Sequence, residues 1–570
     1  MALAESTPHA PRAEQLGPLE RGLCVLRAVA TAPEPRMRPG DLVRATGLAR
    51  SPVDRITSTL IRLGHLRSDG RDLVPAPRLL ELGNAFLSGS GLPDLVQPYV
   101  NRLADELGES VSVIVPDGCD MRLIAQAVVR RRTLSLAFHI GDLLPAERCA
   151  AGAVLAAGWG AAEYDIWRAR RDEDPTDARF PVVPVRVSVP QEQEVERRFV
   201  AWAQQARDTG WALDDQLVAP GLVALAMPVP GPDGEAVCAV SVLSHTHRHS
   251  AEGLREFALP RLTAATADMA EALRRGTPGT DTAHAPASAP GDRPAARFED
   301  PDFDDAKGEM GSAFVQSLAR GLAVMTALGT ARGGMTLSAV AEAAALPAAS
   351  ARRALLTLVD QGYATADGRL FSLLPKVLEL GYARLSGLSF TEIVQPHLVE
   401  LVQQVRESAS ISVLSGDDVL YVARVATGRI TSASISLGTR FPAYATSMGR
   451  VLLADRSASE RAAYFERVSP QPLTRHTLTS PAGIGAALDT AAREGHALVD
   501  QELEEGLRSV AVPIRGRNGR AVAALNVALH VGHETPQDTR AMMLPALRLA
   551  AARIEADLAV VSERTSVAIP

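Results

Sequence analysis

Two segments of the chain carry arginines and hydroxyl side chains at spacings that suit hydrogen bonding to nucleic acid. Residues 49–71 read ARSPVDRITSTLIRLGHLRSDGR, and residues 347–369 read PAASARRALLTLVDQGYATADGR. A guanidinium group donates in a planar fork that matches phosphate oxygens or the edge of guanine. The side chains from which we expect such contacts are Arg50, Ser51, Asp54, Arg55, Ser58 and Arg71 in the first segment, and Ser350, Arg352, Arg353 and Arg369 in the second.

Three helices and a hairpin must position these side chains. An apolar-periodic helix begins near Leu19 and again near Leu318, a second short helix follows each, and the quoted segments supply a third helix that stops at Gly64 or Gly362. The Asp-Gly pairs that close the segments predict a hairpin turn. This order predicts a winged helix-turn-helix, whose third helix enters the major groove and whose wing reaches flanking phosphates. A purely structural or dimerising three-helix module, with arginines on a solvated face, is the alternative.

The two segments belong to a long internal repeat. Arg353 lies 298 residues after Arg55, and the same offset holds without a gap from Met37 to Glu109. Matching residues continue beyond it, with Gly221 opposite Gly506. A solenoid repeats every 20–50 residues or so, so this period indicates a duplicated protomer.

Composition limits the classes of function. The chain has 570 residues and a net charge of −7, which argues against nonspecific coating of nucleic acid. Residues 19–81 are nevertheless locally basic, with 11 arginines against 7 acidic residues. No long apolar run or signal peptide is evident, so we expect no membrane span and a cytoplasmic protein. The four scattered cysteines are expected to be reduced.

Several motifs of the second copy resemble one known family. Residues 346–353 fit Leu-Pro-x-x-Ser-x-x-Arg, residues 355–363 fit Leu-x-x-Leu-x-x-x-Gly-Tyr, and residues 375–381 resemble that family's linker helix. Gln395-Pro396-His397-Leu398 and Glu407-Ser408 extend the match. These motifs resemble the IclR family of bacterial transcription regulators. The resemblance implies a double-stranded DNA operator and a small organic acid effector as partners, and it allows self-association, since family members assemble as dimers and sometimes as dimers of dimers.

The expected fold is an α+β tandem duplication, in which each copy has a winged helix-turn-helix domain, a linker helix and an α+β effector-binding domain. We expect a disordered tail at residues 1–16, reading domains at 17–77 and 313–375, effector-binding-type domains at 78–273 and 376–562, and a flexible linker at 274–312.

The resemblance also points to an effector site in copy two. Thr446 and Ser447 lie where a strand end should meet a helix start, and free N–H groups with a hydroxyl there would hold a carboxylate. Thr446 could equally be a helix N-cap. The stretches around both residues resemble the branch that senses aromatic acids of the β-ketoadipate pathway, such as protocatechuate or 4-hydroxybenzoate, so we expect control of an aromatic-acid catabolic operon. The expected effector residues are Gly438, Tyr444, Ala445, Thr446, Ser447, Asp500, Glu502, Ser509 and Asn526.

Copy one departs from this pattern. Residues 146–153 read AERCAAGA where residues 443–450 read AYATSMGR, so the hydroxyls are lost. Leu217 replaces Glu502 and Ala224 replaces Ser509, although Asp215 remains opposite Asp500. We therefore hypothesise that copy two senses the ligand and that copy one mainly supports a dimer-like architecture.

The remaining sequence features give weaker indications of function. His245, His247 and His249 alternate and would face one side of a strand, where they could hold a metal, but a solvated loop or strand end is expected, with no metal and no cofactor. No Gly-x-Ser-x-Gly, phosphate loop or Cys-x-x-Cys is present, so no catalytic residue is assigned. The rival functions are a ligand-sensing interaction module without DNA readout and an enzyme acting on a small acid. Because the two reading helices differ, we expect a pseudo-palindromic operator with unequal half-sites.

Overall fold

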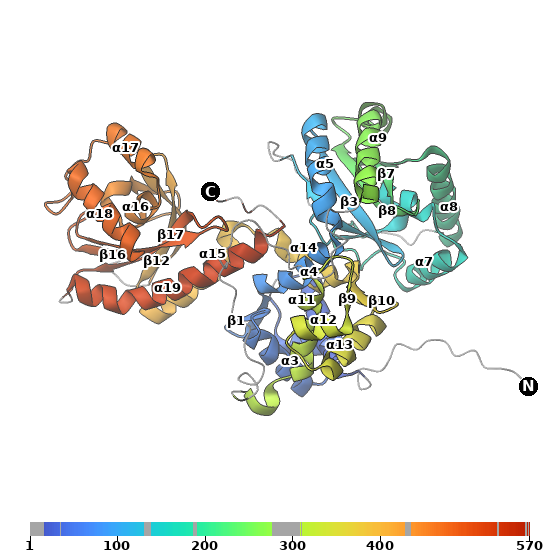
Figure 1. The fold of residues 1–570 in the computed structure, drawn as a ribbon, viewed down its shortest axis with the longest axis horizontal. Helices are drawn as coiled ribbons and strands as arrows, with labels where there is room; N and C mark the ends of the chain where they lie inside the picture. Colours follow the sequence, from blue (N-terminus) through green and yellow to red (C-terminus); the bar gives the residue numbers. More distant parts are fainter. Residues whose placement is uncertain are drawn as a thin grey trace, which may run out of the picture. The chain divides into compact units, whose positions relative to one another are not determined.

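The computed structural model describes residues 16–34, 36–129, 138–185, 191–275, 308, 310–427, 435–532, 535–564, 567 and 569. Residues 1–15 of the expected tail and most of the expected linker, residues 276–307 and 309, therefore lie outside the described residues. The chain divides into two compact units (Figure 1). The first contains both winged-helix domains and the larger domain of copy one, up to Gly387, and the second begins at Leu388.

The winged-helix domain of copy one has the expected order of elements. An apolar stripe on the third helix is buried against the other two, with Val53, Ile56 and Leu60 at most 2% exposed. Gly47 sits in the left-handed region at φ 66°, which lets the chain turn sharply between the second and third helices. The elements are α1 (Pro18–Thr31), α2 (Pro39–Thr46), α3 (Arg50–Arg62), β1 (Leu66–Asp69) and β2 (Asp72–Pro75).

Copy two repeats this domain with two local differences. Ala345 takes the left-handed position of Gly47, at φ 51°. A two-residue strand, β9, pairs with β11 where copy one has only a single bridge between Met37 and Leu73. The elements are α11 (Gln316–Leu328), β9 (Met335–Thr336), α12 (Leu337–Ala343), α13 (Ala348–Asp360), β10 (Ala364–Asp367) and β11 (Leu370–Leu373).

The two winged-helix domains pack against each other within the first unit. The side chain of Leu318 occupies the space where a Cβ of Gly22 would lie, and Leu19 does the same at Gly321. These four residues are repeat equivalents, so the contact between α1 and α11 is the self-complementary contact of a two-fold dimer, made inside one chain.

The linker segments of the two copies differ. In copy one, a 3-10 turn (Pro77–Leu79) leads directly into helix α4 (Leu80–Ser90). In copy two, Pro375–Leu380 forms a 3-10 helix that stops at Gly381, at φ 117°, before the short helix α14 (Tyr382–Ser386). The linker helix expected at residues 375–381 is thus not an α-helix, because Leu79 packs against Gly381 and the Tyr382 hydroxyl donates to Asn84 Oδ1 at 2.8 Å.

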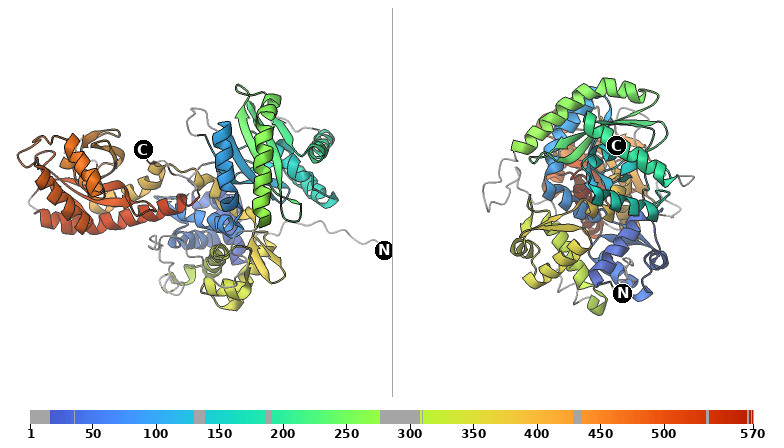
Figure 2. Two further views of the ribbon diagram at one scale, coloured as in Figure 1. Left: turned by 45° about the horizontal axis from the view of Figure 1, so that its top comes forward. Right: turned by 90° about the vertical axis from the view of Figure 1, so that its right-hand side faces the viewer.

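The larger domain of copy one is an antiparallel six-stranded sheet with helices on both faces. Its strand order is β5-β4-β3-β8-β7-β6. Helices α5 and α9 lie side by side on one face (Figure 2), and α6 and α8 cover the other. The elements are α5 (Leu92–Leu107), β3 (Ser110–Asp117), β4 (Asp120–Ala127), β5 (Leu143–Pro145), α6 (Ala150–Ala156), α7 (Ala161–Glu173), α8 (Glu192–Thr209), β6 (Ala212–Asp215), β7 (Leu222–Pro230), β8 (Ala236–His245) and α9 (Ala251–Arg275).

The second unit has the same design, with strand order β14-β13-β12-β17-β16-β15. Helices α15 and α19 cover one face, and α16 and α18 cover the other. The elements are α15 (Phe390–Val405), β12 (Ser408–Ser415), β13 (Asp418–Val425), β14 (Arg440–Pro442), α16 (Ser447–Ala454), α17 (Ala458–Arg467), α18 (Pro481–Glu494), β15 (Ala497–Asp500), β16 (Leu507–Arg515), β17 (Ala521–His530) and α19 (Pro536–Val561).

The α+β tandem duplication predicted from the sequence is confirmed. The four cysteines are free thiols. Within the described ranges, no helix is both long and apolar enough to cross a membrane.

Candidate functional site

The reading helix of copy one presents fewer free charges than its sequence suggests. Ser51, Arg55 and Ser58 are exposed on α3, as expected. Arg50 donates to the Asp54 carboxylate at 2.8 Å one helical turn away, so these two predicted contacts largely neutralise each other. Arg55 has no ion-pair partner among the described residues and is left as the main positive group on this face.

The reading helix of copy two is more electropositive. Arg352 and Arg353 stand next to each other on α13, both exposed, and neither has an ion-pair partner in the described part of the chain. Ser350, one of the expected contact residues, is buried. Its side chain is only 8% exposed, because this turn of α13 faces α11, where Arg320 donates to the Ser350 hydroxyl at 3.4 Å.

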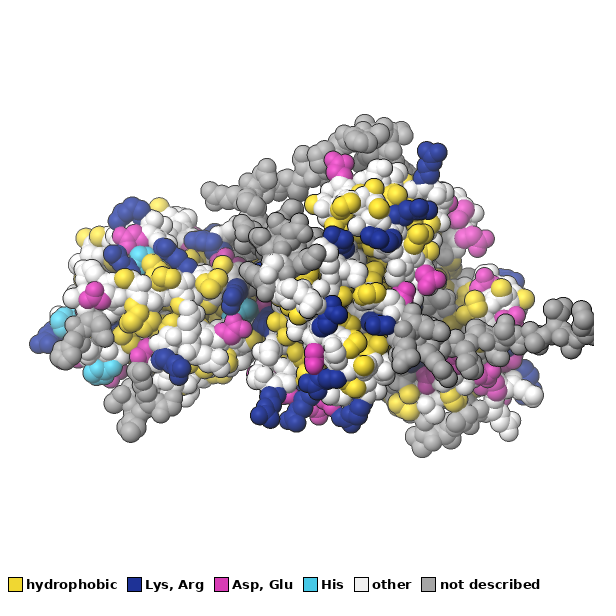
Figure 3. All heavy atoms as spheres, turned by 90° about the horizontal axis from the view of Figure 1, so that it is seen from below, with side chains coloured by type: hydrophobic (Ala, Val, Ile, Leu, Met, Phe, Trp, Pro, Cys, Tyr) yellow, Lys and Arg dark blue, Asp and Glu magenta, His cyan; other side chains and the backbone are white. Residues whose placement is uncertain are grey.

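The two wings place one arginine each beside the hairpin tip. Arg71 and Arg369 follow Gly70 and Gly368, which adopt φ of 64° and 58° in the turns, and both arginines are exposed. Figure 3 shows dark-blue Lys and Arg side chains standing out over the winged-helix pair in the middle of the view. This surface suits contact with a polyanion.

A cavity of about 300 Å³ lies on the α16 face of the copy-two sheet. Strand register places three of its polar side chains in one row, because Ser410 is paired with Arg424 on β13 and with Asn526 on β17. Neighbouring strands are about 5 Å apart, so Arg424 and Asn526 are separated by roughly 10 Å at the backbone. That spacing suits a small ligand with polar groups at both ends.

The amide of Asn526 is the deepest polar group of this row. Its side chain is 3% exposed, and its Oδ1 has no hydrogen-bond partner among the described residues. A buried acceptor without a donor is costly, so this oxygen is suited to receive an O–H or N–H of a ligand. Asn526 is the one predicted effector residue that lines the cavity.

Arg424 and Tyr421 were missed by the sequence analysis. The half-buried Arg424 guanidinium donates to the Ile435 carbonyl at 2.6 Å. Burial raises the pKa of Tyr421 to about 12 despite the nearby Arg424, so the phenol stays neutral, and its ring packs edge-on against Phe441 at 5.7 Å. A comparison of the two copies could have found both residues, because they differ there. Gln126 stands at the position of Arg424 in copy one, and Leu123 stands at the position of Tyr421.

The predicted residues around α16 hold the site's backbone rather than line the cavity. Thr446 is the N-cap of α16, since its hydroxyl accepts from the Gly449 N–H at 3.0 Å. Ser447 and Ser509 share a hydrogen bond of 2.9 Å, and the Tyr444 hydroxyl bonds the backbone of Gln471. The alternative that Thr446 caps a helix is therefore the one that the structure supports.

The remaining predicted residues are also engaged elsewhere. Glu502, 7% exposed, accepts from Arg450 at 2.5 Å and from the Leu478 N–H at 3.0 Å. Asp500 accepts from Arg508 at 2.8 Å, outside the cavity lining. Gly438 donates its N–H to the Tyr421 carbonyl at φ 86°, and Ala445 is buried in the core beside α16.

The copy-one residues at the positions of Tyr444 and Ala445 belong to a network of buried charges beside α6. Glu147, at the position of Tyr444, accepts from Trp167 Nε1 at 3.0 Å and from Arg170 and Arg171 at 2.6 Å and 2.8 Å. Burial alone would raise its carboxyl pKa, but these cations and hydrogen bonds hold the pKa of Glu147 at about 2. The carboxylate is therefore permanently ionised and fully paired.

The residue after Glu147 extends this network of buried charges. Arg148, at the position of Ala445, donates to Asp177 at 2.9 Å and to the carbonyls of Leu217, Pro184 and Val218 at 2.9–3.0 Å. Asp214 lies buried behind it, and burial raises its pKa to about 7. Copy one thus carries buried, paired charges at this junction, where copy two has uncharged side chains.

The histidines of copy one do not converge. His245 ends β8 and stacks on His247 with ring centroids 5.2 Å apart, whereas His249 stacks on Phe257 and lies 3.4 Å from Glu109. No group of three or more His, Cys, Asp or Glu in the described ranges could hold a metal ion.

Known proteins match both copies. The profile of the IclR helix-turn-helix domain matches residues 18–70 and 317–368. The profile described as bacterial transcriptional regulator IclR C-terminal matches residues 84–174 and 382–556.

Individual relatives match about one copy's length of the chain. The Pca regulon regulatory protein of Pseudomonas putida is 45% identical over 241 residues, which is 42% of this chain and 82% of that protein. The p-hydroxybenzoate hydroxylase transcriptional activator of Acinetobacter baylyi is 32% identical over 240 residues, 41% of this chain and 89% of that protein. The crystal structure of a putative transcriptional regulator from Rhodococcus sp. RHA1 is 49% identical with a TM-score of 0.42, covering 44% of this chain and 100% of that one. The chain therefore belongs to the IclR family of bacterial transcriptional regulators and carries the family's two domains twice.

Proposed function

We propose that this regulator reads an operator with its two winged helices and senses a small aromatic carboxylate through the cavity of copy two. The observation that carries the ligand assignment is the row Arg424–Ser410–Asn526 across three neighbouring strands. A guanidinium is suited to a carboxylate, and the unsatisfied Asn526 oxygen is suited to a phenolic O–H. Tyr421, which also lines the cavity, supplies a ring surface next to Arg424 and packs against Phe441.

The relatives support the aromatic part of this proposal. One is named as regulator of the Pca regulon and another as activator of p-hydroxybenzoate hydroxylase. We therefore expect this chain to respond to a hydroxylated benzoate and to control genes for aromatic-acid breakdown. The proposal places the protein in the cytoplasm, where operator DNA is, and gives it no catalytic step.

The two reading helices favour an operator with unequal half-sites. Copy one offers Arg55 beside the Arg50–Asp54 pair, whereas copy two offers the adjacent Arg352 and Arg353. Fusion also replaces the association of two protomers by an intramolecular contact, which raises the effective concentration of the second head. We expect one chain to occupy one operator, and pairing of two chains to bring four heads together.

The test uses the full chain and the DNA upstream of its own gene in a mobility-shift assay. We expect sequence-dependent retardation that changes when 4-hydroxybenzoate or protocatechuate is added. The double variant Arg55→Ala, Arg353→Ala should lose the shift and keep ligand binding. A chain that binds the acid but never prefers its own upstream DNA would instead be a sensor without DNA readout, and turnover of the acid would indicate an enzyme.

The unequal half-sites are tested by the single variants. Arg55→Ala and Arg353→Ala should each weaken protection of a different half of the footprint, and to different extents. A symmetric footprint with equal sensitivity to both substitutions would contradict this part of the proposal.

A further inference from the structure

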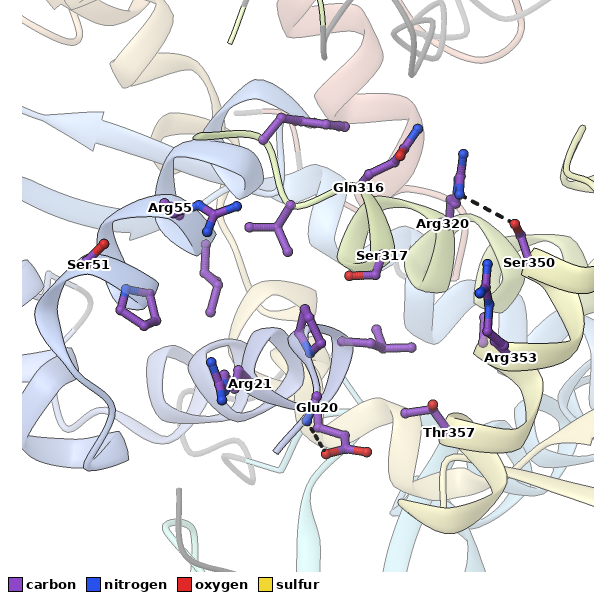
Figure 4. A pocket seen from close by; sticks show the side chains of 18 residues that line it. Glu20, Arg21, Ser51, Arg55, Gln316, Ser317, Arg320, Ser350, Arg353 and Thr357 are labelled. Atoms are coloured by element: carbon purple, nitrogen blue, oxygen red, sulfur yellow. Dashed lines mark hydrogen bonds between the residues drawn. The ribbon is translucent and has the colours of Figure 1, made fainter. Parts of the chain in front are cut away.

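A cleft of about 610 Å³ lies between the two winged-helix domains within the first unit. The first turns of α1 and α11 form its floor, and the first two turns of α3 and α13 form its walls (Figure 4). Arg55 and Arg353 stand on the two walls, while Arg21 and Arg320 come from the two floor helices. Each pair consists of repeat equivalents, so the cleft is approximately two-fold symmetric in its chemistry.

The cleft is strongly cationic. Four arginines line it, and Glu20 is its single carboxylate, which already accepts from the Gly17 N–H at 2.7 Å. Arg320 donates to Ser350 through Nη1, but its buried Nε has no hydrogen-bond acceptor among the described residues. A buried donor without an acceptor, inside a cluster of cations, is satisfied best by an anionic oxygen.

The position of the cleft identifies the anion. Helix-turn-helix pairs read half-sites about one helical turn apart, so the groove and phosphates between the half-sites face the centre of the pair. Arginines are attracted there because a narrow minor groove concentrates negative potential. The same walls that carry the base-reading residues Arg55 and Arg353 bound this cleft, so whatever DNA those residues read must also pass over it.

We propose that Arg21 and Arg320 bind the DNA backbone at the centre of the operator, between the stretches read by α3 and α13. The inference rests on the proposed DNA reading and adds a third contact region to it. Because the contacts go to phosphate, they set affinity and the spacing of the half-sites and leave base preference unchanged.

The first experiment measures operator binding by fluorescence anisotropy across a salt series, with the full chain. Each lost phosphate contact lowers the slope of log K against log salt by about 0.9. The double variant Arg21→Ala, Arg320→Ala should therefore flatten the slope by about 1.8 and bind roughly tenfold more weakly at moderate salt, with the ranking of mutated operators unchanged. The variant Arg320→Lys, which keeps the charge, should retain most of the slope.

The control is Arg102→Ala, which removes one positive charge at an exposed position on α5, outside the cleft. Its slope should equal that of the unchanged protein. If the double variant behaves like Arg102→Ala, the inference is overturned.

A second measurement leaves the protein intact and so does not depend on how the variants fold. Operators whose central phosphates are replaced by neutral methylphosphonates should lose affinity as the double variant does, and undiminished binding would overturn the inference. Failure of the unchanged chain to prefer operator over unrelated DNA would overturn the proposed function instead, so the two failures are distinguishable.

Discussion

The larger domains of the two copies have the same backbone fold and differ in the side chains on one face of the sheet. Both have the same strand order and a register irregularity at the same place, at Val113/Ile114 and Ile411/Ser412. In both, the first turn of the helix after the strand packs so closely that a Cβ at Gly152 or Gly449 would overlap the preceding backbone. Copy two has a cavity on this face, whereas copy one has a buried charge network.

The comparison shows that a few side chains separate the two domains, and on our proposal these side chains decide which copy senses the ligand. Glu147 and Arg148 replace Tyr444 and Ala445, and their charges are paired within the domain. Gln126 replaces Arg424, so the cation of the row is also missing. The scaffold tolerates this exchange because paired buried charges can replace apolar packing without changing the fold.

The largest expected effect is on the stability of copy one. Glu147→Gln leaves Arg170 and Arg171 short of a buried counter-charge and should cost about 3–5 kcal/mol. All four tryptophans, Trp159, Trp167, Trp202 and Trp211, lie in this domain, so tryptophan fluorescence during urea unfolding of the full chain reports on it alone.

The matched change in copy two is Tyr444→Phe, which loses hydrogen bonds to Gln471 and should cost about 1 kcal/mol. Circular dichroism, to which both copies contribute, measures this loss of stability. Equal losses in the two copies would mean that the charge network is no more important than an ordinary hydrogen bond.

A slightly smaller effect on the stability of copy one is expected when Asp214 is replaced. Its copy-two counterpart is Val499. Burial raises the pKa of Asp214 from 3.8 to about 7, so its ionised form is disfavoured in the folded state. The proton-linked stability is present below about pH 4 and is lost as pH rises towards 7. Asp214→Asn should therefore stabilise copy one by about 2–4 kcal/mol at pH 8 and by less at pH 5.

The control for that change is Asp215→Asn, its exposed neighbour, which should have little effect at either pH. Tryptophan fluorescence during unfolding at both pH values measures the difference. A stabilisation that is the same at pH 5 and pH 8 would show that ionisation of Asp214 is not the cause.

The next effect concerns the ligand. Arg424→Gln gives copy two the side chain of copy one and should weaken binding of 4-hydroxybenzoate about 100-fold, because a charge-assisted pair with the carboxylate is lost. Arg440→Gln, on the neighbouring strand β14, removes the same charge outside the cavity lining and should bind normally. The reverse change, Gln126→Arg, should create no second site, because Ser241 stands where copy two has Asn526; a gained site would contradict the account that copy one does not sense the ligand.

The smallest effect should separate the two ends of the ligand. Asn526→Ser again copies the first domain, where Ser241 holds this position, and replaces the amide oxygen proposed to accept a phenolic O–H by a hydroxyl on a shorter side chain. Binding of 4-hydroxybenzoate should fall about tenfold, and binding of benzoate, which lacks the hydroxyl, should hardly change. Equal losses for both acids, measured by calorimetry, would place the phenol elsewhere.

The fold could be predicted because the internal repeat and the turn residues indicate its elements. The glycines at hairpin tips, the apolar stripe on α3 and the alternation in β12 and β13 all predict elements that the structure contains. The break at Gly381 was not predictable, since it depends on Leu79 from the other copy. Long-range packing of this kind leaves little local signal in a sequence.

The site was less predictable than the fold. A hydroxyl at a helix start predicts a cap and a ligand contact equally well, and Thr446 proved to be a cap. Residue type alone also did not indicate that Arg50 is paired with Asp54 or that Ser350 is turned inward. Arg424 escaped notice because only strand register places it in one row with Ser410 and Asn526.

The number of ligand molecules bound per chain tests the central claim most directly. Isothermal titration of the full chain with 4-hydroxybenzoate or protocatechuate should give one molecule per chain for the unchanged protein, and no measurable binding in the same concentration range for Arg424→Gln. Two molecules per chain, or one molecule that survives Arg424→Gln, would contradict the account that copy two senses the ligand and copy one does not.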